Sequence, residues 1–169
     1  MPEITKLIGE RFTFAVDFTP KLPDNGALVS GVLMARRVGK TESTTLTASV
    51  SPAAMTVSLA DNVRAGALLI IDPGLTTEEP LLVLSVAGNG PYTATLASAV
   101  QLAHASAAPV RYEQGATETL LASPTASISG TQMKANVVGG LVYHYVVTFL
   151  ATLVSGEILR EDVDVILND

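Results

Sequence analysis

The stretch Phe12-Thr13-Phe14-Ala15-Val16-Asp17-Phe18 decides the fold class of this chain. Apolar residues alternate with small or polar ones along it, which is the two-residue period of a strand with one buried face. It also holds three of the four phenylalanines in the 169-residue sequence. We therefore predict a strand at residues 12–18 that anchors a hydrophobic core.

Strand patterns continue outward from this stretch at both ends of the chain. Thr19 to Gly26 is rich in Pro, Asn and Gly and is expected to turn. Residues 27–38 follow as a second strand or pair of strands, with Gly31 as a candidate bulge. Further strands are expected at 125–128, 133–137, 143–153 and 158–167. Gly139-Gly140 and Ser155-Gly156-Glu157 mark the turns on either side of strand 143–153, and the second is typical of a hairpin.

A second group of strand patterns lies between these ends, from about Thr41 to Gln114. Six short segments with alternating or continuous apolar residues are separated by turn residues: 44–50, 55–59, 67–71, 81–86, 92–96 and 110–113. Six short strands at close spacing indicate a small closed or nearly closed barrel. For the alanine-rich stretch 97–108, both a helical turn and a loop stay open.

The count of strands decides how these parts combine. The N-terminal segment has two or three strands and the C-terminal segment about four, and neither number buries a core. Together they make about seven strands, the ordinary number for an Ig-type sandwich. We therefore predict an all-β chain: an Ig-like β-sandwich formed by residues 1–40 and 115–169, interrupted by a small inserted β-barrel at residues 41–114.

Composition narrows the function classes. An apolar content of 48% supports real cores, so the chain is not a disordered tail. The net charge is −6, the isoelectric point is about 4.8 and only Arg36, Arg37 and Lys40 cluster, so there is no basic footprint for nucleic acid. A weakly charged surface rich in Thr, Ser and Ala suits a protein that buries its outside against partners. The alternative is simply a Thr-rich β protein.

Other features bear on location and redox chemistry. The chain has no cysteine, which excludes disulfides, thiolate metal sites and thiol nucleophiles. Residues 1–6 lack the basic and apolar regions of a signal peptide. The apolar stretch 141–154 is shorter than the roughly 20 apolar residues that a membrane-spanning helix needs. We expect a protein made in the cytoplasm, with neither a membrane nor nucleic acid among its partners.

No motif predicts catalysis. Val38-Gly39-Lys40-Thr41 resembles the end of a phosphate-binding loop, but residue 34 is Met where the motif needs Gly, and no helix is expected to follow. His104 and His144 have no acidic residue or histidine two or four positions onward, which disfavours a metal site. We see no nucleophile–base arrangement. We therefore expect no enzyme activity and no cofactor, and predict no catalytic, cofactor-binding or metal-binding residue.

Two acidic groups remain as candidate contact sites. Glu78-Glu79 is expected in a turn, where two exposed carboxylates are the default. Asp162 and Asp164 fall on one face of the last strand, where they could meet cations or a basic partner. The alternative is a solvated face or a strand edge protected by charge.

Several of these segments resemble a known family. Phe12–Phe18, the stretch Ser123–Gly130, and Gly139-Gly140 followed by Tyr143–Phe149 are similar to small Ig-like proteins of tailed bacteriophages that are described as fibre–tail adaptors. The hairpin at Ser155-Gly156-Glu157 and the charged last strand are similar to the usual ending of that family. The resemblance covers about 95 residues, counted over 1–40 and 115–169.

The insert resembles a recurring phage β module at two places, Val63–Asp72 and Ala103-His104-Ala105-Ser106-Ala107. In that comparison His104 is a structural loop residue. An insert of this kind departs from the usual adaptor.

The resemblance implies a non-catalytic structural protein of the virion, at the neck, collar or tail, which links fibres or other virion proteins. It implies neck, tail or fibre proteins as partners, and multiple symmetric copies on the particle. Two other functions stay open. One is a carbohydrate-binding module for host surface glycans, against which the absence of Trp and the presence of only four Tyr count. The other is a capsid decoration protein.

Overall fold

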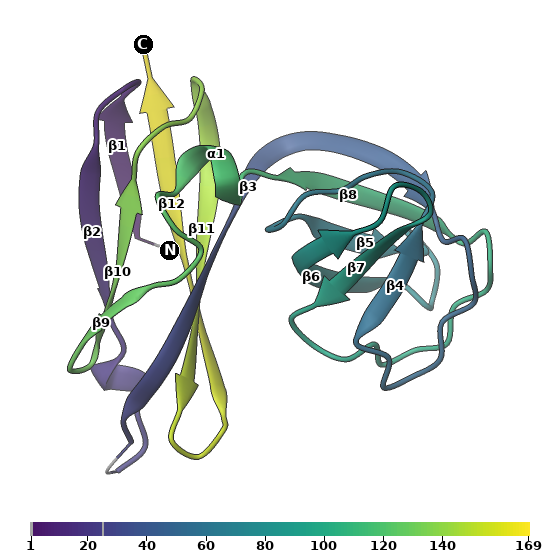
Figure 1. Ribbon diagram of the computed structural model, residues 1–169, viewed down its shortest axis with the longest axis horizontal. Helices are drawn as coiled ribbons and strands as arrows, with labels where there is room; N and C mark the ends of the chain where they lie inside the picture. Colours follow the sequence, from purple (N-terminus) through teal and green to yellow (C-terminus); the bar gives the residue numbers. More distant parts are fainter. Residues whose placement is uncertain (1, 25) are drawn as a thin grey trace. The chain divides into compact units, whose positions relative to one another are not determined.

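The computed structural model describes residues 2–24 and 26–169 and is almost entirely β (Figure 1). The chain divides into two compact units, one formed by the residues up to Ala35 together with Ala116–Asp169, the other by Arg36–Gly115. The sequence-based boundaries are 40/41 and 114/115. In the structure the first boundary lies between Ala35 and Arg36, not at 40/41. The sequence could not place it, because β3 (Leu28–Thr45) is a continuous strand shared by both units and no turn marks the start of the insert.

The first unit is a sandwich of two layers (Figure 1). Its elements besides β3 are β1 (Glu3–Leu7), β2 (Phe12–Asp17), the 3-10 helix η1 (Thr19–Lys21), the one-turn α1 (Thr117–Leu120), β9 (Ser127–Ser129), β10 (Gln132–Val137), β11 (Tyr143–Leu153) and β12 (Ile158–Asn168). One layer has the order β1–β12–β11–β3 and the other β2–β10–β9. β1 pairs with β12 in parallel, whereas β11 with β12 and β2 with β10 are antiparallel.

This strand order is that of an immunoglobulin-type fold. β2, β10 and β9 take the places of strands B, E and D, and β3, β11 and β12 those of strands C, F and G. The unit is therefore an Ig-like β-sandwich, and the second unit is inserted after strand C.

The sandwich core lies between the two layers. Phe12, Phe14 and Val16 of β2 are half-buried and pack against it, while the residues between them are exposed, as the sequence predicts. Phe149 of β11 is fully buried. Its ring meets that of Phe14 edge to face, with the ring centroids 5.5 Å apart, an arrangement that aromatic pairs favour.

A single tyrosine fixes the turn before β11. The Tyr145 hydroxyl accepts a hydrogen bond from the Leu141 N–H at 2.8 Å and donates one to the Leu141 carbonyl at 3.2 Å. This is the tyrosine corner, which Ig-like sandwiches place near the start of strand F. Gly140 in this turn has a φ of +117°, and an added Cβ would lie 3.0 Å from Leu120 Cδ1, so the turn requires glycine.

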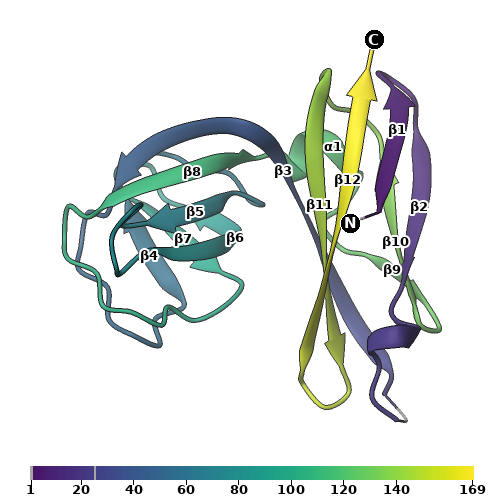
Figure 2. The same cartoon turned by 180° about the vertical axis from the view of Figure 1, so that it is seen from behind.

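The second unit is a closed barrel (Figure 2). Within residues 36–115, all of which are described, its strands are the C-terminal part of β3, β4 (Thr56–Leu59), β5 (Leu68–Ile71), β6 (Glu79–Ala87), β7 (Tyr92–Leu96) and β8 (Pro109–Gly115). Their order is β3–β8–β5–β6–β7–β4. Leu46 pairs with Leu59 and closes the ring, and the Ala60 N–H donates to the Thr45 carbonyl beside this bridge at 3.0 Å. Closure removes the unpaired edges of the sheet.

The barrel core is aliphatic apart from Tyr112. It contains no phenylalanine, and its fully buried side chains include Leu59, Leu69, Ile71, Val83 and Leu96. These residues come from the strand segments whose apolar alternation predicts the barrel, so the sequence pattern and the observed core agree.

One local expectation is revised and one open alternative is decided. β3 ends at Thr45, so the predicted strand 44–50 continues only as single bridges at Leu46 and Val50. The stretch 97–108 is a loop. The pairing of β3 with β8 is irregular between Arg36 and Thr41, and at Gly31 the Met133 side chain approaches the backbone too closely for a Cβ.

Candidate functional site

A buried cluster of three ionisable side chains lies at the end of the barrel where β5 leads into β6. The His104 ring has its Nδ1 2.8 Å from Asp72 Oδ2 and its Nε2 3.0 Å from Glu79 Oε2. The side chain of His104 is 0% exposed, and those of Asp72 and Glu79 are 10% and 9% exposed. With a carboxylate at each ring nitrogen, the geometry fits an imidazolium, which donates from both nitrogens.

The electrostatics of the cluster agree with this assignment. Burial by itself lowers the pKa of His104, but the hydrogen bonds and charges of Asp72 and Glu79 outweigh it and raise the pKa above 6.5. The hydrogen bond from His104 is the main cause that holds the pKa of Asp72 below 3.8. Burial raises the pKa of Glu79, and the N–H groups of Gln101 and Leu102 together with His104 outweigh it and lower the pKa below 4.5.

The sequence did not indicate this cluster. Glu79 is only 7% exposed, so the prediction of two exposed carboxylates at Glu78-Glu79 is wrong for Glu79 and holds for Glu78 alone. His104 lies 32 residues from Asp72 and 25 from Glu79, far beyond the local spacing of a metal motif. The one feature of the sequence that pointed to the cluster was His104 itself, a histidine in the stretch 97–108 that has no charged residue. Among the described residues, no group of three ligands could hold a metal ion.

The other histidine belongs to a more exposed network on the sandwich. His144 Nε2 is hydrogen-bonded to Asp164, and the His144 side chain is 42% exposed. Asp162 accepts a hydrogen bond from the Thr148 hydroxyl at 2.6 Å and pairs with Arg160 at 2.7 Å. Both aspartates are therefore engaged by neighbours within their own sheet, and β12 is no edge strand because β1 and β11 pair with it, which favours the interpretation as a solvated face.

The phosphate-loop-like stretch Val38-Gly39-Lys40-Thr41 lies inside β3, where the pairing with β8 is irregular. Glu113 of β8 holds this irregularity: its carboxylate pairs with Arg36 Nε at 3.0 Å and accepts the Gly39 N–H at 3.1 Å. No helix follows the stretch, so it lacks the architecture that a phosphate-binding loop requires.

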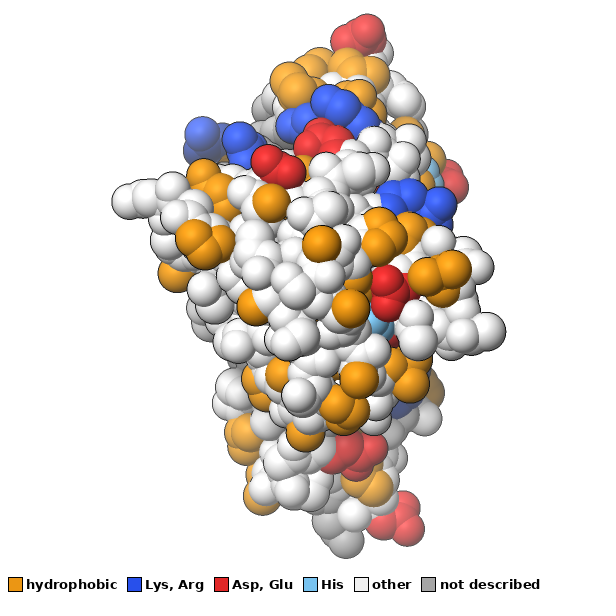
Figure 3. Space-filling model, turned by 90° about the vertical axis from the view of Figure 1, so that its right-hand side faces the viewer, with side chains coloured by type: hydrophobic (Ala, Val, Ile, Leu, Met, Phe, Trp, Pro, Cys, Tyr) orange, Lys and Arg blue, Asp and Glu red, His pale blue; other side chains and the backbone are white. Residues whose placement is uncertain are grey.

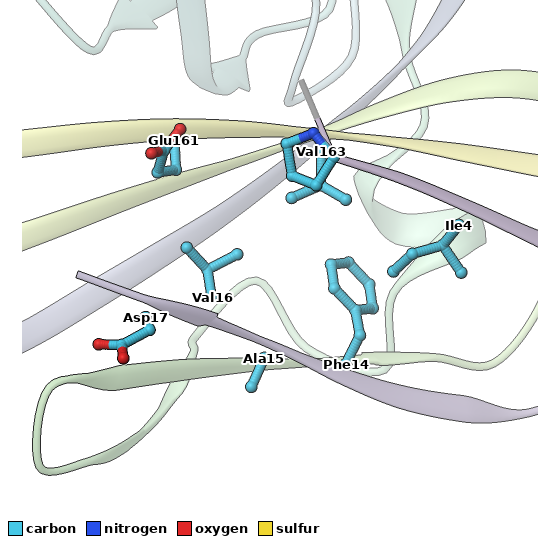
Figure 4. Close-up of a pocket in the computed structure, with 8 residues that line it drawn as sticks. Ile4, Phe14, Ala15, Val16, Asp17, Glu161 and Val163 are labelled. Carbon is cyan, nitrogen blue, oxygen red and sulfur yellow. The ribbon is translucent and has the colours of Figure 1, made fainter. Parts of the chain in front are cut away.

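A cavity of about 270 Å³ opens between the two layers of the sandwich (Figure 4). Its wall combines apolar side chains, which include Ile4, Phe14 and Val163, with polar groups. The two carboxylates that line it already have partners: Glu161 pairs with a lysine at 2.9 Å, and Asp17 accepts hydrogen bonds from two threonines. The cavity thus offers no convergent set of unpaired polar groups.

Exposed apolar side chains gather at one end of the sandwich. This apolar end patch consists of Leu7, Ile8, Val138, Leu141, Val142 and Tyr143, which are 36–54% exposed. Strand pairing places Leu7 and Tyr143 at the same end of the sheet, because Leu7 is opposite Asn168 and Tyr143 is opposite Leu167 on the same strand, β12. The two side chains leave the sheet on opposite faces, since Leu167 and Asn168 are neighbours in one strand. The patch holds six of the thirteen large apolar side chains that are exposed among the described residues. It is thus the main apolar gathering on the sandwich surface.

One part of the barrel surface carries no charged residue. Residues 43–60 and 80–110 contain no Asp, Glu, Lys or Arg. The two segments are neighbours, since β4 pairs with β7 and Val50 pairs with His104. Their exposed residues are uncharged, and Figure 3 shows one face of the molecule on which charged side chains are few among apolar and uncharged polar ones.

Comparison with known proteins adds no relative. No protein-family model matches the chain, and no curated protein matches it. No helix among the described residues is long and apolar enough to cross a membrane.

Proposed function

We propose that the chain is a structural protein of a tailed-bacteriophage particle, an adaptor at the neck, collar or tail that joins fibres or other virion proteins without catalysis. The proposal combines the resemblance of both sequence parts to phage modules with one structural observation that carries it, the apolar end patch. The chain is an Ig-like sandwich with an inserted barrel, and we propose its place on a particle.

The apolar end patch supports a contact function because its six exposed apolar side chains lie at the same end of the sandwich. Single exposed apolar residues are ordinary on protein surfaces, whereas a contiguous group marks a site of interaction. The patch also contains Tyr143, and aromatic residues are enriched in the cores of protein–protein interfaces.

The uncharged barrel surface supports a second contact area. Charged residues are depleted from interface cores, and a chain with a net charge of −6 avoids like-charge repulsion where it presents no charge. Two separate contact areas, one on each unit, suit an adaptor that occurs in multiple copies and joins different components of a particle.

The alternative of a glycan-binding module receives less support. Sugar-binding surfaces use exposed aromatic rings, which are apolar on the face and polar at the edge. Among the described residues, Tyr143 is the only aromatic side chain in the exposed class, and it lies within the apolar end patch. A capsid decoration protein is the closer alternative, because it would use the same kind of contacts.

Particle localisation tests the proposal. Phage particles produced together with this chain should retain it through density-gradient purification, and quantitative mass spectrometry should find it at a fixed multiple copy number. A cryo-electron microscopy map should place its sandwich and barrel at the neck, collar or tail. Density on the capsid shell would support the decoration protein instead, and a chain that stays wholly in the soluble fraction would overturn both.

A matched pair of variants tests the role of the patch. Leu141→Asp places a charge in the apolar end patch and should reduce particle-bound copies at least tenfold. Val154→Asp places the same charge at the tip of the β11–β12 hairpin, where Val154 is 71% exposed, and should leave the copy number unchanged. Equal loss in both variants would contradict a specific role of the patch. Circular dichroism spectra should show that both variants fold.

A further inference from the structure

The buried cluster Asp72–His104–Glu79 connects parts of the barrel that are far apart in sequence. Asp72 follows β5, Glu79 begins β6, and His104 lies in the middle of the loop formed by residues 97–108. This loop, here called the barrel-end loop, closes one end of the barrel. The cluster is the only place where ionised side chains hold it among the hydrogen bonds and ion pairs of the described residues.

Most of the other contacts of the barrel-end loop are backbone hydrogen bonds. The His104 N–H donates to the Val50 carbonyl at 3.0 Å, and the Val50 N–H donates back at 2.9 Å. The Glu79 carboxylate adds two further bonds, from the Gln101 N–H at 2.7 Å and the Leu102 N–H at 3.2 Å. Glu79 therefore fastens both the tip of the loop and its histidine.

We infer that Asp72, His104 and Glu79 form a pH-sensitive latch that holds the barrel-end loop closed while His104 carries a proton on both ring nitrogens, and releases it when that proton is lost. The inference is independent of any role on a particle, because it concerns only the interior of the barrel.

The latch should open because His104 has fewer N–H donors after it loses a proton. A neutral imidazole has one N–H and one lone pair, so only one of the two carboxylates keeps its donor after deprotonation. The other, buried at about nine-tenths, then faces a lone pair and keeps only its remaining donors, the Thr77 hydroxyl for Asp72 or the Gln101 and Leu102 N–H groups for Glu79. A buried charge that loses its cationic partner is destabilised. Opening the loop hydrates that carboxylate and relieves the cost.

Few other groups can mimic this response. Thr77 donates its hydroxyl to Asp72 and does not titrate, and the carboxylate of Glu78 is exposed and accepts the Gly74 N–H. Burial and the neighbouring Glu42 raise the pKa of Tyr112, the buried tyrosine of the barrel, to about 12. Its hydroxyl therefore stays protonated while His104 titrates.

The directions of the pKa shifts of His104, Asp72 and Glu79 set the pH range in which the latch is closed. The pKa of His104 is raised, so the latch is complete below 6.5 and weakens as the pH rises through the raised value. The pKa values of both carboxylates are lowered, so the latch keeps its strength down to their usual values of 3.8 and 4.5 and weakens in stronger acid. The latch is thus fully closed between these limits.

Amide hydrogen exchange on the full chain tests the latch. Protection factors of the Gln101, Leu102 and His104 amides, corrected for intrinsic exchange, should fall above pH 6.5 by up to about tenfold per pH unit and then level off. His104→Gln, which cannot ionise, should show low protection at pH 6 and no such slope. His144→Gln, which removes the other histidine, should keep the wild-type profile. The same slope in His104→Gln would overturn the latch.

A measurement on the unaltered protein covers the case in which His104→Gln does not fold. Nitrogen chemical shifts of the His104 ring, recorded against pH, should show both nitrogens protonated at pH 6 and a titration midpoint above 6.5. A neutral ring at pH 6 would overturn the inference. A raised midpoint with constant protection of the three amides would also overturn it, because deprotonation would then leave the loop closed.

Discussion

The two units fasten the turns at their ends with different chemistry. In the sandwich, the uncharged hydroxyl of Tyr145 holds the turn before β11 through two hydrogen bonds to Leu141. In the barrel, an imidazole between two carboxylates holds the barrel-end loop. Both arrangements tie a loop to the strands, but only the second depends on the charge of the groups that form it.

This difference shows how core composition shapes the options for a loop. The sandwich has aromatic residues in its core, and a tyrosine can bury its ring there while its hydroxyl reaches the backbone. The barrel core is aliphatic apart from Tyr112, whose hydroxyl donates to Glu42 and not to the barrel-end loop, where a buried ionic cluster takes that role. A hydrogen bond from a hydroxyl to the backbone contributes a modest free energy that does not change with pH near neutrality. A buried ion pair keeps its attraction only while both partners stay ionised.

The largest effect should come from the aromatic core. Phe149→Ala should lower the free energy of unfolding of the sandwich by about 3–5 kcal/mol, because it removes a buried ring and leaves a cavity. Urea unfolding followed by circular dichroism measures the loss, and native-state hydrogen exchange assigns it to a unit. Leu150→Ala, at the half-buried neighbouring position, is the control and should cost less. An equal loss of protection in the barrel would show that the two units do not unfold separately.

Alkaline pH should weaken the barrel and spare the sandwich. Raising the pH from 6 through the raised pKa of His104 should cost the barrel about 1–3 kcal/mol, because one buried carboxylate loses the charged donor among its hydrogen-bond partners. Residue-resolved exchange in a urea series measures both units in one sample. An equal loss of stability in both units would contradict a pH dependence that is confined to the barrel.

The tyrosine corner should be weaker and independent of charge. Tyr145→Phe keeps the ring and removes both hydrogen bonds to Leu141, so the sandwich should lose about 0.5–1.5 kcal/mol. The loss should be the same at pH 6 and pH 8. A pH-dependent loss in urea unfolding would mean that the corner, too, is coupled to an ionising group.

The smallest effect is expected at the exposed histidine. His144→Gln should change the free energy of unfolding by less than about 0.5 kcal/mol, because its pair with Asp164 is partly exposed to water. Thermal and urea unfolding of this variant beside His104→Gln gives the sharpest form of the comparison. A large loss of stability in His144→Gln would show that the exposure of a histidine–carboxylate pair does not predict its contribution to the free energy of unfolding.

Much of the architecture could be predicted from local patterns. The alternation at Phe12–Phe18 and in the segments of the insert determined that the chain is all-β, and the count of strands at the two ends suggested a sandwich completed across an insert. These signals are readable because the side-chain period of a strand and the turn preferences of Gly, Pro and Asn are local properties of the backbone.

Only the tertiary structure decided the remaining features. The closure of the barrel at Leu46 and Leu59, the shared strand β3, the apolar end patch and the partners of His104 all join residues that are distant in sequence. Such contacts depend on how strands register against one another, which no local period encodes. Glu79 illustrates the point: its neighbours in sequence suggest an exposed turn, whereas strand pairing buries it against a histidine 25 residues away.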